Sequence, residues 1–213
     1  MIYLSSALIF PKVSKATEEG LLALGGDLSP ERLLLAYRSG IFPWYEEDQP
    51  ILWWSPNPRM VLFLDQFHVS KSFRKTLHSR RFTVTFNQNF SEVVRLCAQV
   101  KRTGQKGTWI TQEMTAAYQK LHALGHALSV EVWNGNRLVG GLYGVDLPKF
   151  GVFCGESMFS LESNASKVGL YHWVEQLKEK RYQLIDCQVF TEHLHSLGAR
   201  EIPREVFMGY LKQ

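Results

Sequence analysis

ALSVEVWNGNRLVGGLYGV, residues 127–145, contains the strongest fold signal in the sequence. Two runs rich in β-branched and aromatic residues flank Asn134-Gly135-Asn136, and such residues tolerate the positive φ angles of tight turns. The stretch therefore predicts an antiparallel hairpin. FGVFCGESMF, residues 150–159, follows closely and is expected to add a third strand.

Strand and helix patterns alternate on both sides of this hairpin. Apolar or alternating runs predict further strands at residues 59–64, 82–86 and 182–190. Amphipathic stretches predict helices within residues 70–79, 90–101, 111–125, 163–181 and 203–212. Single strands mixed with a meander indicate an α+β fold, in which helices flank a mixed α/β sheet.

The first part of the chain lacks this alternation. GGDLSPERLLLAYRSG, residues 25–40, predicts a helix with Ser29 as N-cap, Pro30 at the first position and Gly40 beyond the end. Residues 40–59 then hold three tryptophans and four prolines, so neither a helix nor a central strand is expected there. We expect a small N-terminal domain at residues 1–60 and a larger domain at residues 61–213.

Composition narrows the function classes. With 213 residues, 45% of them hydrophobic, the chain can bury a substantial core, and no apolar run approaches the ~20 residues of a membrane span. The start of the chain lacks a basic n-region and a small-residue cleavage site, so we expect no signal peptide. Three cysteines without a C-x-x-C pair argue against a disulfide framework and a zinc site, and the seven histidines show no metal-ligand spacing. We expect a cytoplasmic protein that binds neither membrane nor metal.

Positive charge is concentrated in one segment. Between Arg59 and Lys106 stand ten Lys and Arg residues against two acidic ones, while the net charge of the whole chain is only +4. Such asymmetry favours a polyanionic partner, although scattered surface lysines are usually just solvated. The candidates for nucleic-acid phosphate contacts are Lys71, Arg74, Lys75, Arg80 and Arg81.

The order of elements is similar to the GNAT N-acyltransferase fold. Members of that fold that use acetyl-CoA carry a glycine-rich turn before the long helix, whose backbone N–H groups hold the pyrophosphate. Here the junction reads GESMFSLESNASKVG, with no paired glycines and with the negative charges of Glu156 and Glu162. A CoA donor is therefore disfavoured, and a CoA-dependent N-acetyltransferase stays an alternative.

Whole motifs point to one family. GLLALGGDLSPERLLLAYRSGIFPW, ILWWSPNPR, GTWIT, EVW, GLYGV, FCGESMFS, NASK and LIDCQV occur in an order that resembles leucyl/phenylalanyl-tRNA–protein transferase. The resemblance implies a GNAT-like second domain and transfer of leucine or phenylalanine, with methionine as a further candidate, from aminoacyl-tRNA to the α-amine of proteins with N-terminal Lys or Arg. The product is an N-degron recognised for degradation. The resemblance implies no cofactor, and nothing in the sequence demands more than a monomer.

Three polar residues take the catalytic roles in this interpretation. Asp186 and Gln188 lie two apart on a predicted strand and should share one face, where they can meet the attacking amine. Glu156, expected at a strand end, would select the basic acceptor residue. The alternative is that all three are structural caps or buried polar groups. Three possibilities stay open for the proton of the amine. Asp186 takes it as a base, Asp186 only orients the amine, or the ribose hydroxyl of the tRNA transfers the proton.

Aromatic and apolar residues complete the expected site. The resemblance assigns the tRNA 3′ end to Tyr37, Trp44, Trp109 and Tyr118, since unpaired bases stack on aromatic rings, whereas Trp53 and Trp54 are expected in the core. The amino-acid pocket is expected at Leu142, Phe153, Met158, Leu170, Trp173 and Ile185, residues that could equally be plain core. A module that binds the tRNA end without catalysis is the third possible function.

Overall fold

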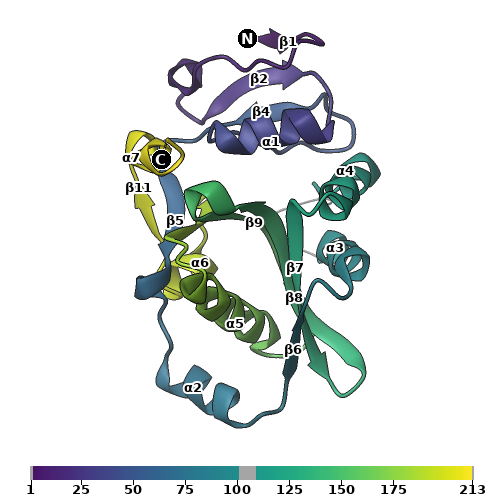
Figure 1. The fold of residues 1–213 in the computed structure, drawn as a ribbon, viewed down its shortest axis with the longest axis vertical. Coiled ribbons are helices and arrows are strands. Elements are labelled where there is room, and N and C mark those ends of the chain that lie inside the picture. The colour runs from purple at the N-terminus through teal and green to yellow at the C-terminus, as the bar shows by residue number, and fades with distance from the viewer. Residues whose placement is uncertain (1, 101–108, 213) are drawn as a thin grey trace.

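The computed structural model describes residues 2–100 and 109–212, which form two β-sheets (Figure 1). The four-stranded sheet has the order β1-β2-β4-β3 and contains β1 (Tyr3–Leu4), β2 (Leu21–Gly25), β3 (Phe42–Pro43) and β4 (Leu52–Trp54). Helix α1 (Pro30–Arg38) lies along this sheet. Both N- and C-termini are near this end of the molecule (Figure 1).

Local capping explains α1, as the sequence predicts. Ser29 is the N-cap, and its Oγ accepts a hydrogen bond from the backbone N–H of Arg32 at 3.4 Å. Pro30 is the first helical residue, and Gly40, beyond the end, has a φ of +70° that glycine adopts without steric cost.

The expectation for residues 40–59 is wrong, because this segment contains two short strands. Pro43 belongs to the edge strand β3, where a missing N–H group costs no ladder hydrogen bond. Pro50 and Pro56 flank β4 rather than interrupt it, so this short strand pairs with both β2 and β3.

The seven-stranded sheet has the order β11-β5-β10-β9-β8-β7-β6. The predicted hairpin is confirmed: β7 (Ala127–Asn134) and β8 (Arg137–Leu147) are antiparallel, and Gly135 has a φ of +57°. Strand β9 (Val152–Ser160) completes the meander. The other strands are β5 (Arg59–Phe63), β6 (Thr83–Phe86), β10 (Leu184–Gln188) and β11 (Arg200–Ile202). Because β10 runs parallel to β9 and antiparallel to β5, the sheet is mixed, as predicted.

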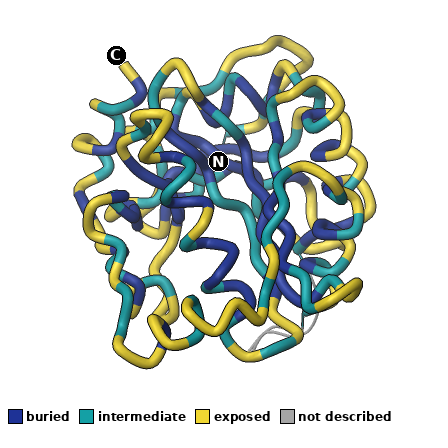
Figure 2. Tube along the Cα trace, turned by 60° about the horizontal axis from the view of Figure 1, so that its bottom comes forward, coloured by how far each residue is buried: buried dark blue, intermediate teal, exposed yellow. Residues whose placement is uncertain are grey.

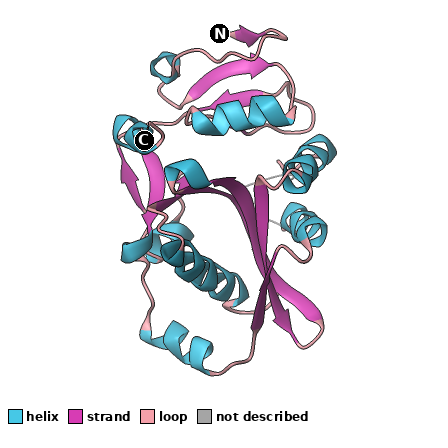
Figure 3. Cartoon of the chain, viewed as in Figure 1, coloured by secondary structure: helices cyan, strands magenta, loops and turns pink. Residues whose placement is uncertain are grey.

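Helices cover both faces of this sheet (Figure 3). Helix α5 (Ala165–Glu179) packs on one face, while α3 (Phe90–Gln99) and α4 (Gln112–Ala123) pack on the other. The remaining helices are α2 (Lys71–His78), α6 (Glu192–Ser196) and α7 (Arg204–Tyr210), with short 3₁₀ turns at Val13–Lys15, Leu64–Gln66 and Pro148–Phe150. The sequence patterns predict all of these longer helices, but they do not predict α6 or the strands β1, β2 and β11.

Buried residues follow the central strands, and exposed ones follow the outer loops (Figure 2). One hydrophobic cluster includes Trp53 of the small sheet and Phe159 of the large one, so the two sheets share a core. A second cluster lies between α5 and the large sheet. Within the described ranges no helix has the length and apolar character to cross a membrane. The boundary at residues 60/61 stays a prediction.

Candidate active site

A cavity of about 400 Å³ lies between the small sheet and the centre of the large one. Its walls come from β3 and the residue that follows it, from the segment before α4, from β5, β8, β9 and β10, and from α5 and α6. The carboxylate of Glu156 and the amide of Gln188 lie in an otherwise mostly apolar lining. Pockets with an apolar wall and a few convergent polar groups are typical binding sites.

Most of the predicted amino-acid pocket lines this cavity. Leu142, Phe153, Met158, Leu170 and Ile185 all contribute to the wall. They come from three strands and one helix, so only the tertiary fold brings them together.

Trp173 is a correction to that prediction. Its side chain is 2% exposed and packs edge-on against the ring of Phe153, with 5.0 Å between ring centroids. It therefore supports the wall from behind and is not part of the lining.

Two of the four aromatic candidates for the tRNA end line the cavity. Trp44 and Trp109 are partly exposed there. The indole N–H of Trp54 donates to the backbone O of Trp44 at 2.7 Å, which fixes the course of this segment. Trp53 is fully buried and donates to Gly25 O, in agreement with the expected core position.

Tyr37 and Tyr118 are in a different environment from the one expected. They are 1% and 0% exposed, which leaves no ring face free for a base to stack on. Their hydroxyl groups are 2.5 Å apart, and the Tyr118 hydroxyl donates to Glu156 Oε2 at 2.7 Å. The tyrosines thus support Glu156 from behind, and the predicted stacking is not compatible with their burial.

Glu156 lies within β9 and not at its end, contrary to expectation. Burial raises the pKa of its carboxyl group from 4.5 to about 7, against the opposing effect of the hydrogen bonds from Tyr118 and Tyr37. The negative charge of Asp186 raises this pKa further. Gln188 Nε2 donates to Glu156 Oε1 at 3.3 Å, so both carboxylate oxygens have partners.

Asp186 and Gln188 do not share a face in the way that the period of two predicts. The register shifts between them in the pairing with β5, and Gln188 has a φ of +61°. This bulge places Gln188 in the cavity lining together with Ile185 and Cys187, whereas Asp186 lies outside the lining and is 1% exposed. Direct contact of Asp186 with the attacking amine is therefore not supported.

The partner of Asp186 is Arg59, a residue that sequence reasoning counted only as part of the basic segment. Arg59 is 1% exposed, and its Nε and Nη2 atoms donate to the two carboxylate oxygens at 2.8 and 2.7 Å. These two residues are 127 positions apart, so no local pattern could reveal the pair. Asp186 Oδ1 also accepts the backbone N–H of Gln188 at 3.1 Å.

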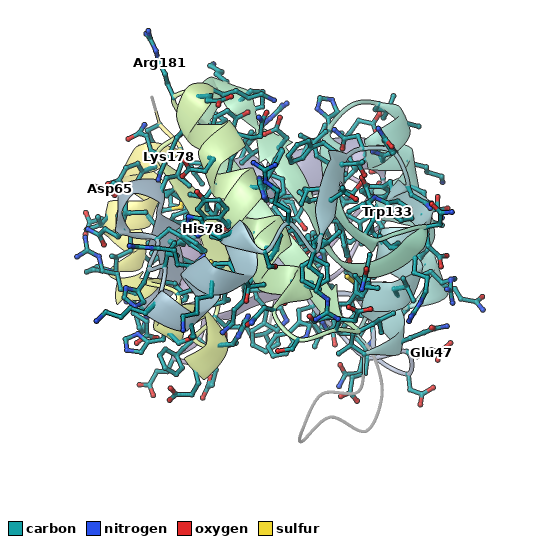
Figure 4. All side chains as sticks on the ribbon, turned by 90° about the horizontal axis from the view of Figure 1, so that it is seen from below. Glu47, Asp65, His78, Trp133, Lys178 and Arg181 are labelled. Atoms are coloured by element: carbon teal, nitrogen blue, oxygen red, sulfur yellow. The ribbon has the colours of Figure 1, made fainter. Side chains whose placement is uncertain are left out.

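The predicted phosphate contacts are exposed and lie away from the small sheet. Lys71, Arg74 and Lys75 project from α2, which lies at the opposite end of the molecule from β1 (Figure 1). Seen from that end, α2 with its labelled His78 lies in front of α5 (Figure 4). Arg81 pairs with Glu162 at 2.5 Å, so a phosphate would have to compete for it.

Three further basic residues of the charged segment, Lys101, Arg102 and Lys106, lie outside the described residues. In the part of the chain that the structure describes, no three His, Cys, Asp or Glu side chains are grouped so as to hold a metal ion.

Comparison with known proteins gives one consistent result. The family model of leucyl/phenylalanyl-tRNA protein transferase matches residues 61–212, and the model of its N-terminal domain matches residues 26–57. Curated proteins named leucyl/phenylalanyl-tRNA–protein transferase are similar along the whole chain. The one from Flavobacterium johnsoniae is 60% identical and covers 100% of this chain and 99% of its own length. The one from Pseudomonas aeruginosa is 55% identical, covering 96% of this chain and 90% of its own length.

Solved structures show more distant likeness. L-PGS from Bacillus licheniformis matches with a TM-score of 0.44 and 12% identity over 82% of this chain and 57% of its own. A GCN5-related N-acetyltransferase from Kribbella flavida matches with a TM-score of 0.41 and 10% identity over 79% of this chain and 59% of its own.

Proposed function

Since the chain belongs to the leucyl/phenylalanyl-tRNA–protein transferase family, we propose that it transfers Leu or Phe from aminoacyl-tRNA to the α-amine of proteins with N-terminal Lys or Arg. The observation that carries this proposal is the cavity, in which an apolar wall meets Glu156 and Gln188 beside Trp44 and Trp109. The new N-terminus would act as an N-degron. The reaction would take place in the cytoplasm, and a monomer would suffice because one chain supplies every wall.

The chemistry requires placement more than activation. The aminoacyl ester is already activated, and an α-amine with a pKa of ~8 is partly neutral near pH 7. An enzyme that holds the two reactants in contact can lower the barrier by about 7–11 kcal/mol through proximity and orientation alone. The cavity supports this because the amide of Gln188 can accept a hydrogen bond from the incoming amine through its Oε1 atom.

Each substrate part has a matching wall. The Leu or Phe side chain would enter the apolar wall around Phe153 and Met158, where hydrophobic contact discriminates weakly between substrates. The terminal adenosine would stack on Trp44 or Trp109. The basic side chain of the acceptor would pair with Glu156, and the exposed basic residues of α2 would contact tRNA phosphates.

A three-substrate assay tests the proposal. The protein is incubated with Phe-tRNA labelled in Phe, with acetyl-CoA carrying a different label, and with a peptide that begins with Arg. Phe label in the peptide is expected. Acetyl label would show an N-acetyltransferase instead, and tRNA binding without transfer would show a binding module.

Two control peptides define the acceptor. The same peptide with an acetylated N-terminus should receive no label, because its nitrogen no longer attacks. A peptide that begins with Asp should receive little, because Glu156 would repel it. Equal transfer to the Arg and Asp peptides would contradict the role of Glu156.

A further inference from the structure

Arg59 connects the two sides of the cavity, and we propose that it is a positioning residue that holds Gln188 through Asp186. This inference rests on the proposed transfer reaction. It concerns a residue that does not line the cavity and contacts no substrate there.

The guanidinium group of Arg59 is held on every side. Two of its nitrogens pair with Asp186 on β10, and Nη1 donates to the backbone O of Gly40 at 3.1 Å. The rings of Phe42 and Phe207 lie over it, with their centroids 4.9 and 4.7 Å from Cζ. One buried side chain thus contacts the catalytic strand, the segment that leads to Trp44, and α7.

Stability alone is a weak reason for such a pair. Two buried charges lose their hydration, and well-packed apolar residues of similar volume often stabilise a protein at least as well. A bidentate pair differs from apolar packing because it fixes the plane and direction of the carboxylate. Arg59 therefore fixes the orientation of the Asp186 carboxylate.

That direction reaches Gln188 through one hydrogen bond. Asp186 Oδ1 accepts both Arg59 Nε and the backbone N–H of Gln188. Gln188 has a φ of +61°, a conformation that residues other than glycine rarely adopt unless their surroundings hold them. The Asp186 carboxylate holds this backbone, and the backbone aims the amide side chain at Glu156.

The aromatic side of the cavity has supports of its own. Phe42 and Pro43 pair with β4, and Trp54 Nε1 donates to Trp44 O. Loss of Arg59 should therefore disturb Gln188 more than the binding of the tRNA end, and lower kcat more than it raises KM for Phe-tRNA.

Two variants separate positioning from folding. Arg59→Met combined with Asp186→Leu removes both buried charges and should keep the melting temperature close to that of the wild type. Its kcat should fall by about 100-fold, the cost of a catalytic group displaced by about 1 Å. Arg59→Lys keeps the charge but not the bidentate geometry and should lose kcat in the same direction, with KM for Phe-tRNA changed by less than about threefold.

Arg32→Lys is the matched control. Arg32 is also fully buried and binds the carbonyl groups of Ser5, Ser6 and Ala7, but it lies away from the cavity lining. Its replacement should lower the melting temperature and leave kcat unchanged. If the Arg59 variants fold and keep wild-type kcat, or if Arg32→Lys lowers kcat as much, the inference is wrong.

Hydrogen exchange tests the same point without the reaction. The Gln188 backbone amide should exchange slowly in the wild type and faster in Arg59→Lys, measured by NMR below the melting temperature of each protein. Equal exchange would refute the positioning role even if transfer is normal. If the Gln188 amide exchanges faster in a folded Arg59→Lys variant, but the wild type transfers no amino acid, only the proposed function is refuted.

Discussion

The buried carboxyl group of Glu156 should make stability depend on pH in a direction that can be measured. Burial raises its pKa from 4.5 to about 7 in the folded protein. The protonated form is therefore favoured by folding, and its stabilising effect is fully present below pH 4.5 and is lost as the pH rises through 7. At about 1.4 kcal/mol per pKa unit, this shift corresponds to roughly 3 kcal/mol between the two limits.

Glu156→Gln isolates this contribution because an amide does not titrate. In urea unfolding, we expect the free energy of unfolding of the variant to rise by about 3 kcal/mol relative to that of the wild type between pH 4.5 and pH 8. At the acidic end the variant should be as stable as the wild type or slightly less stable. Its amide nitrogen replaces one carboxyl oxygen, so the hydrogen bond that either Tyr118 or Gln188 donates loses its acceptor.

The control is Glu92→Gln on the surface of α3. The hydrogen bond from Arg95 lowers the pKa of Glu92, so the variant should lose stability relative to the wild type mainly as the pH rises towards 4.5, and the difference should change little between pH 4.5 and 8. A stability difference between Glu156→Gln and the wild type that stays constant from pH 4.5 to 8 would refute the reasoning. It would mean that water or another group solvates the Glu156 carboxylate.

Three further changes test the proposed walls of the site. Trp109→Ala should weaken binding of a 3′-aminoacyl-adenosine analogue by about 1–3 kcal/mol in calorimetry; an unchanged Kd would show that the base stacks elsewhere. Met158→Ala should enlarge the apolar wall and raise the ratio of kcat/KM for Phe-tRNA over Leu-tRNA by about tenfold, and an unchanged ratio would place the side chain outside the pocket. Reversal of Arg80 and Arg81 to Glu should weaken tRNA binding and flatten its dependence on salt, whereas Arg95→Glu, on α3 and outside the proposed phosphate contacts, should not; equal slopes for the wild type and both variants would exclude the pair.

Local signals in the sequence were sufficient for much of the fold. The Asn134-Gly135-Asn136 turn and the Ser29 cap act through neighbouring residues, so their chemistry is visible in a short window. The two-residue strand β3 and the three-residue strand β4 have no such signal, since so short a run shows no period and prolines surround it. Their formation depends on pairing with β2, which a linear pattern does not contain.

The site shows the same limit more sharply. Motif resemblance predicted Glu156, Gln188 and apolar residues that the structure places around one cavity, but the rule of alternating faces failed at Asp186 because a bulge intervenes. The burial of Tyr37 and Tyr118 behind Glu156 depends on how α1 and α4 pack, which residue type alone does not specify.

The environment of Cys187 bears on the order of events in the reaction. Its side chain lines the cavity, where a thiolate could in principle take the amino acid from the tRNA. Burial, and then the charge of Asp186, raise the pKa of this thiol far above its ordinary value of 9.0, so almost none is ionised near pH 7. Since only the thiolate is an effective nucleophile, a covalent aminoacyl-enzyme is disfavoured. The ester and the acceptor amine must then occupy the cavity together, which is why the orientation of Gln188 matters more than the reactivity of any single side chain.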